Sequence, residues 1–249
     1  MIKNKKVNAA ILIIGNEILS GRTQDTNTST IAIWLNSIGV KVQEVRVIPD
    51  IEKIIIETVN ELRKKNDYVF TTGGIGPTHD DITAESISKT FQLDYEIHKG
   101  AFKILEAYYK QGEFNEGRQK MVWMPKDAKL ILNPTSGAPG FIVENVFCLP
   151  GVPSILKSML GGLKNMIVGG EPILSHTVSL RTVESEIAQS LTNVQNNNKD
   201  VEIGSYPFFQ AGKLGVSIVI RSEDKSKIDK CNSQILNFVK EKKLEVVSR

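Results

Sequence analysis

Residues 71–83 are Thr71-Thr72-Gly73-Gly74-Ile75-Gly76-Pro77-Thr78-His79-Asp80-Asp81-Ile82-Thr83. They follow a short apolar run at 67–70, typical of a buried strand, and precede a helical pattern at 84–91. A glycine-rich turn between a strand and a helix exposes backbone N–H groups at the positive end of the helix dipole, which suits a phosphate. The two adjacent aspartates of this stretch are the type of ligand that holds a divalent metal against a phosphate. The stretch therefore predicts a phosphate site.

The residues before this turn alternate between strand and helix patterns. Residues 7–14 are almost continuously apolar, as expected for a central parallel strand that is covered on both faces. Residues 29–38 have an amphipathic helical pattern, and residues 40–48 predict a strand nearer the sheet edge. The alternation predicts an α/β domain with a doubly wound, mostly parallel sheet.

Beyond Phe91 the pattern becomes irregular. Helical pieces are predicted at 100–109 and 114–124 and a short strand at 129–132, followed by a turn-rich loop with Ser136 and Gly137. An antiparallel pair is expected at 141–144 and 146–149, ahead of Pro150-Gly151 and a helix at 154–163. Three loops containing glycine can then meet at one rim of the sheet, because ligands bind at the carboxyl ends of parallel strands.

A change of composition near residue 170 suggests a domain boundary, with one domain at 1–170 and a second at 171–249. The second part has the order β-α-β-β-α-β, which predicts a small α+β domain of the ferredoxin-like type. The spacing Gly212-Lys213-Leu214-Gly215 matches the G-x-x-G loop of nucleic-acid-binding KH domains, but it opens a strand, so a hairpin turn is expected.

Composition excludes several classes of protein. The chain has 249 residues, 41% hydrophobic and 24% charged, which is ordinary for a globular protein, and the net charge of +3 is too weak to indicate nucleic-acid binding. The apolar run at 7–14 is too short to span a membrane. Cys148 and Cys231 lack metal-ligand spacing and are expected to be buried thiols in a cytoplasmic protein. Basic residues near both ends are expected to be solvated: Lys3, Lys5, Lys6, Lys240, Lys242, Lys243 and Arg249.

The motif at 71–77, with Asp81-Ile82-Thr83, resembles the signature of the MoaB/Mog family of molybdopterin-binding domains. Further motifs narrow the resemblance to the amino-terminal part of the competence-damage inducible (CinA) proteins: residues 15–21, Asp25-Thr26-Asn27, Asn133-Pro134, residues 138–141 and residues 149–153. Residues 203–207 also resemble the molybdopterin-binding-like half of eukaryotic FAD synthases. The resemblance covers nearly the whole chain.

The resemblance implies a doubly wound α/β domain with its site at the carboxyl ends of the strands. It also implies functional roles for the aspartates at the positions of Asp50 and Asp81. CinA-type members are associated with metal-dependent hydrolysis of ADP-ribose, and the FAD synthase half with hydrolysis of FAD. CinA proteins carry a further deamidase domain that this sequence lacks, so no deamidase activity is expected.

These observations give a set of candidate site residues. Asp81 and Asp50 are the catalytic candidates, and Asp81 and Glu17 are the candidate ligands of a divalent metal, Mg, Mn or Co. The phosphate- or ligand-binding candidates are Thr72, Gly73, Gly74, Gly76, Gly15, Glu17, Ser136, Gly137, Pro150 and Gly151. Helix capping remains an alternative role for both aspartates, and Asp80 would then be the catalytic partner in place of Asp81. Asp25 and Asn27 are interpreted as caps.

Three functions follow as hypotheses. The first is metal-dependent hydrolysis of a nucleotide pyrophosphate of the ADP-ribose or FAD class. The second is molybdopterin binding or adenylylation in molybdenum cofactor biosynthesis, and the third is a binding module without turnover. In each case we expect a small nucleotide or pterin phosphate as the ligand, no nucleic-acid or membrane partner, and a homo-oligomer.

Overall fold

The computed structural model describes residues 6–210 and 212–247, so the expectations for Lys3, Lys5 and Arg249 lie outside the described residues. The chain divides into two compact units, Met1–Gly170 and Glu171–Arg249, and each is described by itself. No helix in the described ranges is long and apolar enough to cross a membrane.

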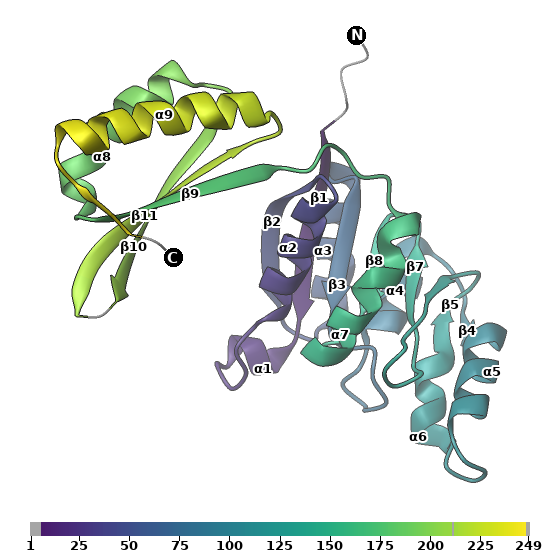
Figure 1. Cartoon of the computed structure of the whole chain (residues 1–249). Helices are drawn as coiled ribbons and strands as arrows, with labels where there is room; N and C mark the ends of the chain where they lie inside the picture. The colour runs from purple at the N-terminus through teal and green to yellow at the C-terminus, as the bar shows by residue number, and fades with distance from the viewer. Residues whose placement is uncertain (1–5, 211, 248–249) are drawn as a thin grey trace. The chain divides into compact units, whose positions relative to one another are not determined.

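The first unit begins with the alternation that the sequence predicts (Figure 1). Its first elements are β1 (Val7–Ile14), α1 (Asn16–Leu19), α2 (Asn27–Ser37), β2 (Val40–Ile48), α3 (Glu52–Lys65), β3 (Tyr68–Thr72) and α4 (Thr83–Phe91). The chain then makes an excursion through β4 (Tyr95–Ile97), α5 (Lys99–Tyr108), α6 (Glu116–Gln119), the 3-10 helix η1 (Lys120–Val122) and β5 (Trp123–Pro125). The unit ends with β6 (Lys129–Ile131), β7 (Gly140–Val143), β8 (Val146–Leu149), α7 (Pro153–Leu160) and η2 (Gly161–Met166).

One sheet of six strands, in the order β2-β1-β3-β8-β7-β6, forms the centre of this unit. The neighbours from β2 to β8 pair in parallel, whereas β7 and β6 are antiparallel additions. The predicted parallel sheet with an appended antiparallel pair is therefore confirmed, and β2 lies at an edge as expected. Strands β4 and β5 of the excursion form a separate antiparallel pair.

The side chains of β1 show why both faces of the sheet are covered. Ala9, Ile11 and Ile13 pack with residues of α2 and α7, whereas Leu12 and Ile14 point to the core under α3, α4 and α5. All eight residues of the strand are apolar except Asn8, and the last six are buried. A strand that is buried on both faces loses the polar alternation of a half-exposed strand, which is the doubly wound pattern.

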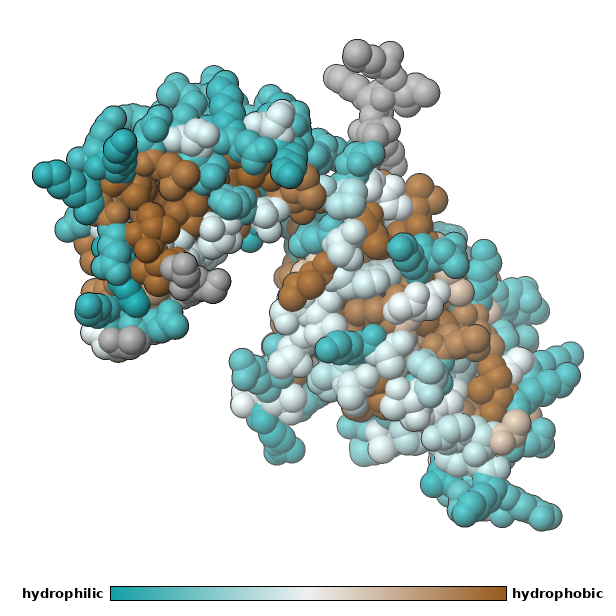
Figure 2. Space-filling model, in the orientation of Figure 1, coloured by the Kyte–Doolittle hydropathy of each residue, from teal (hydrophilic) through white to brown (hydrophobic). Residues whose placement is uncertain are grey.

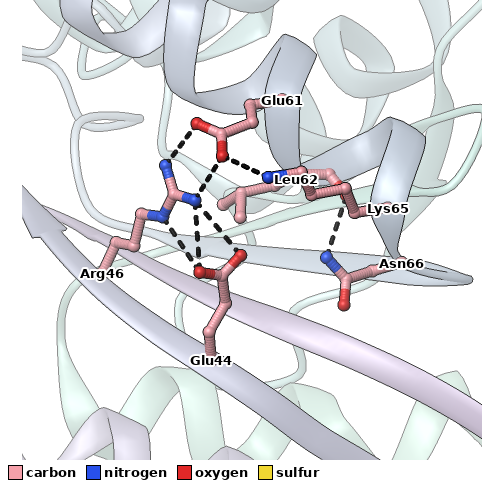
Figure 3. A network of polar contacts seen from close by, with 6 residues as sticks. All are labelled: Glu44, Arg46, Glu61, Leu62, Lys65 and Asn66. Carbon is pink, nitrogen blue, oxygen red and sulfur yellow. Dashed lines mark hydrogen bonds and ion pairs between the residues drawn. The ribbon is translucent and has the colours of Figure 1, made fainter.

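An ion-pair cluster joins the edge strand to the helix beside it (Figure 3). Arg46 on β2 donates to Glu44 of the same strand at 3.2 Å and to Glu61 on α3 at 2.7 Å. Lys65, one turn further along α3, also donates to Glu61, at 2.6 Å. The cluster therefore ties β2 to α3 at the solvent-facing edge of the sheet.

The second unit has the predicted β-α-β-β-α-β order, which is confirmed. Its elements are β9 (Leu174–Arg181), α8 (Glu184–Asn197), β10 (Glu202–Gln210), β11 (Lys213–Ser222), α9 (Lys225–Glu241) and β12 (Glu245–Val247). The strands form an antiparallel sheet in the order β10-β11-β9-β12, and the helices pack on it around a core of their own. In this unit the helix side is largely hydrophilic, and apolar residues are visible between the helices and the sheet (Figure 2).

Two smaller predictions are also confirmed. Gly212 has a φ of 72° and lies between β10 and β11, so the G-x-x-G spacing belongs to a hairpin rather than to a nucleic-acid-binding loop. Cys148 and Cys231 are both buried, free thiols.

Candidate functional site

The glycine-rich turn after β3 is held from both sides by backbone contacts. The Gly73 N–H donates to the Leu149 carbonyl at 3.1 Å, while Thr83 at the start of α4 donates its N–H to Gly74 O and its hydroxyl to Gly73 O. Gly73 and Gly74 have φ values of 103° and 68°, which favour glycine. A Cβ on Gly73 would lie 2.1 Å from the Ile14 carbonyl oxygen, so the turn requires a glycine there.

The same contacts decide which N–H groups a ligand can reach. The Gly73 N–H is already used by Leu149, so Gly73 shapes the turn and does not offer its amide to an anion. The N–H groups of Gly74, Ile75 and Gly76 have no acceptor among residues 6–210 and 212–247. Successive free N–H groups in a glycine-rich turn are the type of group that can bind an anion.

Asp81 lies against this turn and is not a helix cap. Helix α4 begins at Thr83, and the Asp81 carboxylate instead accepts from the Thr78 N–H at 2.7 Å and the Thr78 hydroxyl at 2.5 Å. Both bonds use Oδ2, which leaves Oδ1 for a ligand as far as the described residues show. A Cβ on Gly76 would lie 2.7 Å from Asp81 Oδ2, so this glycine allows the carboxylate to approach the turn.

Asp50 lies at the end of β2 and accepts from the backbone of the first rim loop. Its Oδ2 receives the Asn16 N–H at 2.8 Å. The alternative that Asp50 caps the following helix is wrong, because α3 begins at Glu52 with Ile51 at the N-cap position and no side-chain cap bond. Asp50 therefore holds the loop that follows β1.

Glu17 and Gly15 occupy that loop. Gly15 donates its N–H to the Ile48 carbonyl at 3.1 Å, so its amide is not available to a ligand either. The exposed Glu17 folds back over it, since a Cβ on Gly15 would lie 2.5 Å from Glu17 Oε1. No three His, Cys, Asp or Glu residues in the described part of the chain form a metal-binding group, so Asp81 and Glu17 do not belong to such a cluster.

Asn27 joins the turn to the loop after β8, and its importance was missed from the sequence. The Asn27 amide donates to Thr72 Oγ1 at 3.0 Å and to the Gly151 carbonyl at 2.7 Å, while the Thr72 hydroxyl donates to the Pro150 carbonyl. Asp25 caps the start of α2 by accepting from the Asn27 N–H. The structure thus brings the candidates Thr72, Pro150 and Gly151 together. The Thr72 hydroxyl, however, is already used in hydrogen bonds with Asn27 and the Pro150 carbonyl.

The loop with Ser136 and Gly137 has different neighbours. Ser136 accepts from the Asn133 side chain at 2.7 Å, and a Cβ on Gly137 would lie 2.7 Å from the Tyr108 ring. These contacts do not involve the glycine-rich turn. The structure therefore does not group Ser136 and Gly137 with the other candidate residues. The buried Pro139 of the same loop, in contrast, lines a hollow that lies beside the glycine-rich turn.

A hollow beside the turn combines polar and aromatic groups. Gly76, Asp81 and Lys120 line it together with residues of the excursion and the adjacent sheet: Ile75, Ala84, Tyr95, Met121, Trp123, Met124, Pro139 and Phe141. Burial raises the pKa of Tyr95 to about 12, so its hydroxyl stays protonated. Neither Lys120 nor the aromatic pair of Tyr95 and Trp123 was singled out from the sequence, because residues 92–128 carry no recognisable motif.

Among the described residues, Asp81 is the one acidic residue that lines the hollow beside the turn, so it is the residue on which a divalent cation would depend there. Mg²⁺ commonly binds to one or two carboxylates and completes its shell with substrate phosphate oxygens and water. Asp81 Oδ1 would supply one carboxylate oxygen to such an ion, and the N–H groups of the turn would bind phosphate oxygens. Asp81 is the residue that would hold such an ion.

Comparisons with known proteins agree with this geometry. A family profile described as "Probable molybdopterin binding domain" matches residues 10–176, and one described as "FAD synthase, middle domain" matches residues 172–247. A protein from Archaeoglobus fulgidus is 36% identical over 234 residues, which are 94% of this chain and 98% of its own length. A "Putative competence-damage inducible protein" from Clostridioides difficile is 32% identical, and this chain spans 53% of its length.

A comparison with solved structures gives a match to about two thirds of the chain. The crystal structure of the protein CinA from Thermoplasma acidophilum, described as of unknown function, is 32% identical with a TM-score of 0.60. The match covers 65% of this chain and 99% of the Thermoplasma acidophilum chain. The resemblance expected from the motifs is confirmed. The chain therefore belongs to the MoaB/Mog-like family of molybdopterin-binding domains, with CinA proteins among its relatives.

Proposed function

We propose that this protein is a metal-dependent hydrolase of a nucleotide pyrophosphate of the ADP-ribose or FAD class. One observation carries the proposal: Ile75 and Gly76, whose N–H groups are free in the described residues, line one hollow with Asp81 after the end of β3. N–H groups bind phosphate oxygens, whereas a carboxylate repels them unless a cation lies between. The match of residues 172–247 to the middle domain of FAD synthase supports a dinucleotide-like ligand.

The chemistry requires binding, charge neutralisation and a water molecule. A water oxygen forms a bond to one phosphorus and the bridging P–O bond breaks, which gives two monophosphates and releases protons. The turn amides neutralise charge on the phosphate oxygens and hold the phosphorus in place. A bound divalent metal supplies Lewis-acid polarisation and a more acidic water. Asp81 is fixed by Thr78, so its free oxygen is oriented before the ligand arrives.

A second candidate is adenylylation of molybdopterin. The match of residues 10–176 to a probable molybdopterin-binding domain favours it, and the same turn would bind the phosphates of ATP. A module that binds a pterin or nucleotide phosphate without turnover uses the same contacts. We propose in each case a small phosphate ligand, a homo-oligomer and a cytoplasmic location.

The test is an assay of purified protein with Mg²⁺, Mn²⁺ or Co²⁺ and either ADP-ribose or FAD. We expect AMP release that depends on metal and that falls by at least about 100-fold in Asp81→Asn, the size of loss typical for an electrostatic catalytic group. Asp80→Asn is the comparison, because the Asp80 side chain is 66% exposed, and we expect it to retain most activity. Adenylylated pterin from ATP and molybdopterin would support the second candidate, and metal-independent or absent AMP release would refute the first.

A further inference from the structure

Lys120 places a positive charge beside the anion-binding turn. It is the first residue of η1, reached through the excursion after α4, and it lines the same hollow as Gly76 and Asp81. Its Nζ donates to the Thr78 carbonyl oxygen, although the two residues are 42 positions apart. The segment between α4 and β5 thus places the positive charge of Lys120 beside a turn that follows a strand of the central sheet.

The bond from Lys120 to Thr78 can be exchanged at little cost. The Thr78 carbonyl also accepts from the Asp81 N–H at 3.2 Å, so it keeps a donor if Lys120 leaves. No Asp or Glu oxygen in the described ranges lies within ion-pair distance of Lys120 Nζ, whereas Lys89 and Lys126 both have such partners. Lys120 is a half-buried cation that is held near the site by a neutral carbonyl oxygen.

The local charges indicate what Lys120 can bind. Asp80 is one carboxylate at this turn, with a side chain that is 66% exposed. Asp81 adds a second carboxylate at the same turn, yet Lys120 pairs closely with neither. A charge-assisted bond to a phosphate oxygen is stronger than one to a neutral carbonyl. A lysine suits an exchange of partners, because its ammonium group is a point charge on a flexible stem.

We propose that Lys120 binds a phosphate oxygen of the ligand and leaves the Thr78 carbonyl to do so. Ile75, Gly76 and Lys120 line the same hollow, so the turn amides and the Lys120 ammonium group can contact different oxygens of one diphosphate. This inference rests on the proposed function only in assuming a phosphate ligand. It requires neither hydrolysis nor metal.

The experiment measures ADP-ribose binding by calorimetry without metal, and KM and kcat with Mn²⁺. Lys120→Met removes the charge and keeps most of the stem, Lys120→Arg keeps the charge, and Lys103→Met changes an exposed lysine of α5 as the matched control. We expect Lys120→Met to weaken binding roughly 10- to 100-fold, as for a lost hydrogen bond to a charged group. Lys120→Arg should recover most of the affinity, and Lys103→Met should match the wild type. The loss should appear in KM more than in kcat.

The outcomes separate this inference from the proposed function. Binding by Lys120→Met within twofold of the wild type overturns the role of Lys120, even if the wild type cleaves ADP-ribose. Wild-type binding without cleavage, together with weaker binding by Lys120→Met, supports the role of Lys120 and refutes the hydrolase. If the wild type neither binds ADP-ribose without metal nor cleaves it with Mn²⁺, both proposals are refuted. Circular dichroism of each variant confirms that the fold is retained.

Discussion

Gly73 is the residue on which the shape of the site depends most directly. Its φ is 103°, and a Cβ at this position would lie only 2.1 Å from the Ile14 carbonyl oxygen, which excludes any side chain without movement of the backbone. We predict that Gly73→Ala lowers the free energy of unfolding by on the order of 4 kcal/mol, a value that marks a severe steric conflict. Chemical denaturation monitored by circular dichroism measures it.

Gly112→Ala is the control for this prediction. Gly112 has a φ of 83°, but a Cβ there would meet nothing within 4 Å. Gly112→Ala should lower the free energy of unfolding by only about 1–2 kcal/mol, which is the penalty of the left-handed backbone conformation itself. Equal destabilisation by the two substitutions would show that the close approach of Gly73 to β1 is not what makes glycine necessary.

At the residue scale, the sequence predicted the turn better than the roles of its members. Glycines beside aspartates are a local signal, so the turn itself could be recognised. Whether a given N–H is free depends on strands that come from elsewhere in the chain, as the use of the Gly73 amide by Leu149 shows. Asn27 and Lys120 reach the site across 45 and 42 positions of sequence, and no local pattern encodes such contacts.

At the scale of elements, the cluster around Arg46 gives a pH-dependent prediction. Hydrogen bonds from Arg46 and Lys65 lower the pKa of Glu61 from 4.5 to about 2. A carboxyl group with a lowered pKa in the folded state stabilises the fold above its unfolded pKa and loses this effect as the pH falls through the folded value. The contribution of Glu61 should therefore be complete above about pH 5 and decline from pH 4.5 toward pH 2.

We expect Glu61→Gln to lower Tm slightly at pH 6, since the group is exposed and screened. The difference from the wild type should shrink as the pH is lowered to about 3, as measured by thermal melts across this range. Glu57→Gln is the matched control on the same helix, because its contact with Lys53 is 3.9 Å and both side chains are largely exposed. A Tm difference for Glu61→Gln that is independent of pH would contradict the assignment.

The elements themselves were predictable where periodicity was regular. Strands β1 and β3 follow a continuous apolar pattern, β2 alternates, and α2 and α4 follow a helical pattern; the structure has these five elements near the predicted limits. The helix predicted at 114–124 is instead α6, η1 and the strand β5. In the second unit, β10 runs from Glu202 to Gln210. In β10, Gly204 and Pro207 disfavour a strand locally, and pairing with β11 overrides that preference.

At the scale of the whole molecule, each unit has a hydrophobic core of its own. The second unit has a hydrophobic cluster, and every residue in it belongs to that unit. Leu180, Ile218 and Phe238 are among its buried members. A segment with its own core can fold alone. In the sequence, a change in composition near residue 170 suggested a domain boundary. In the structure, the two compact units divide after Gly170.

We therefore predict that residues 171–249, expressed alone, fold cooperatively. Circular dichroism should show a mixed helix and strand spectrum with a sigmoidal thermal transition. The fragment 1–170 should retain the metal-dependent activity proposed above if the site is complete within the first unit. A spectrum of an unfolded chain for residues 171–249 would show that this unit depends on the first.

The most direct test of the proposed site is a crystal structure of the protein soaked with ADP-ribose and Mn²⁺. We predict an anomalous Mn²⁺ peak in direct contact with Asp81, with diphosphate oxygens on the N–H groups of Gly74, Ile75 and Gly76. A diphosphate bound away from residues 74–81, or a bound diphosphate at the turn with Mn²⁺ on other side chains only, would contradict it.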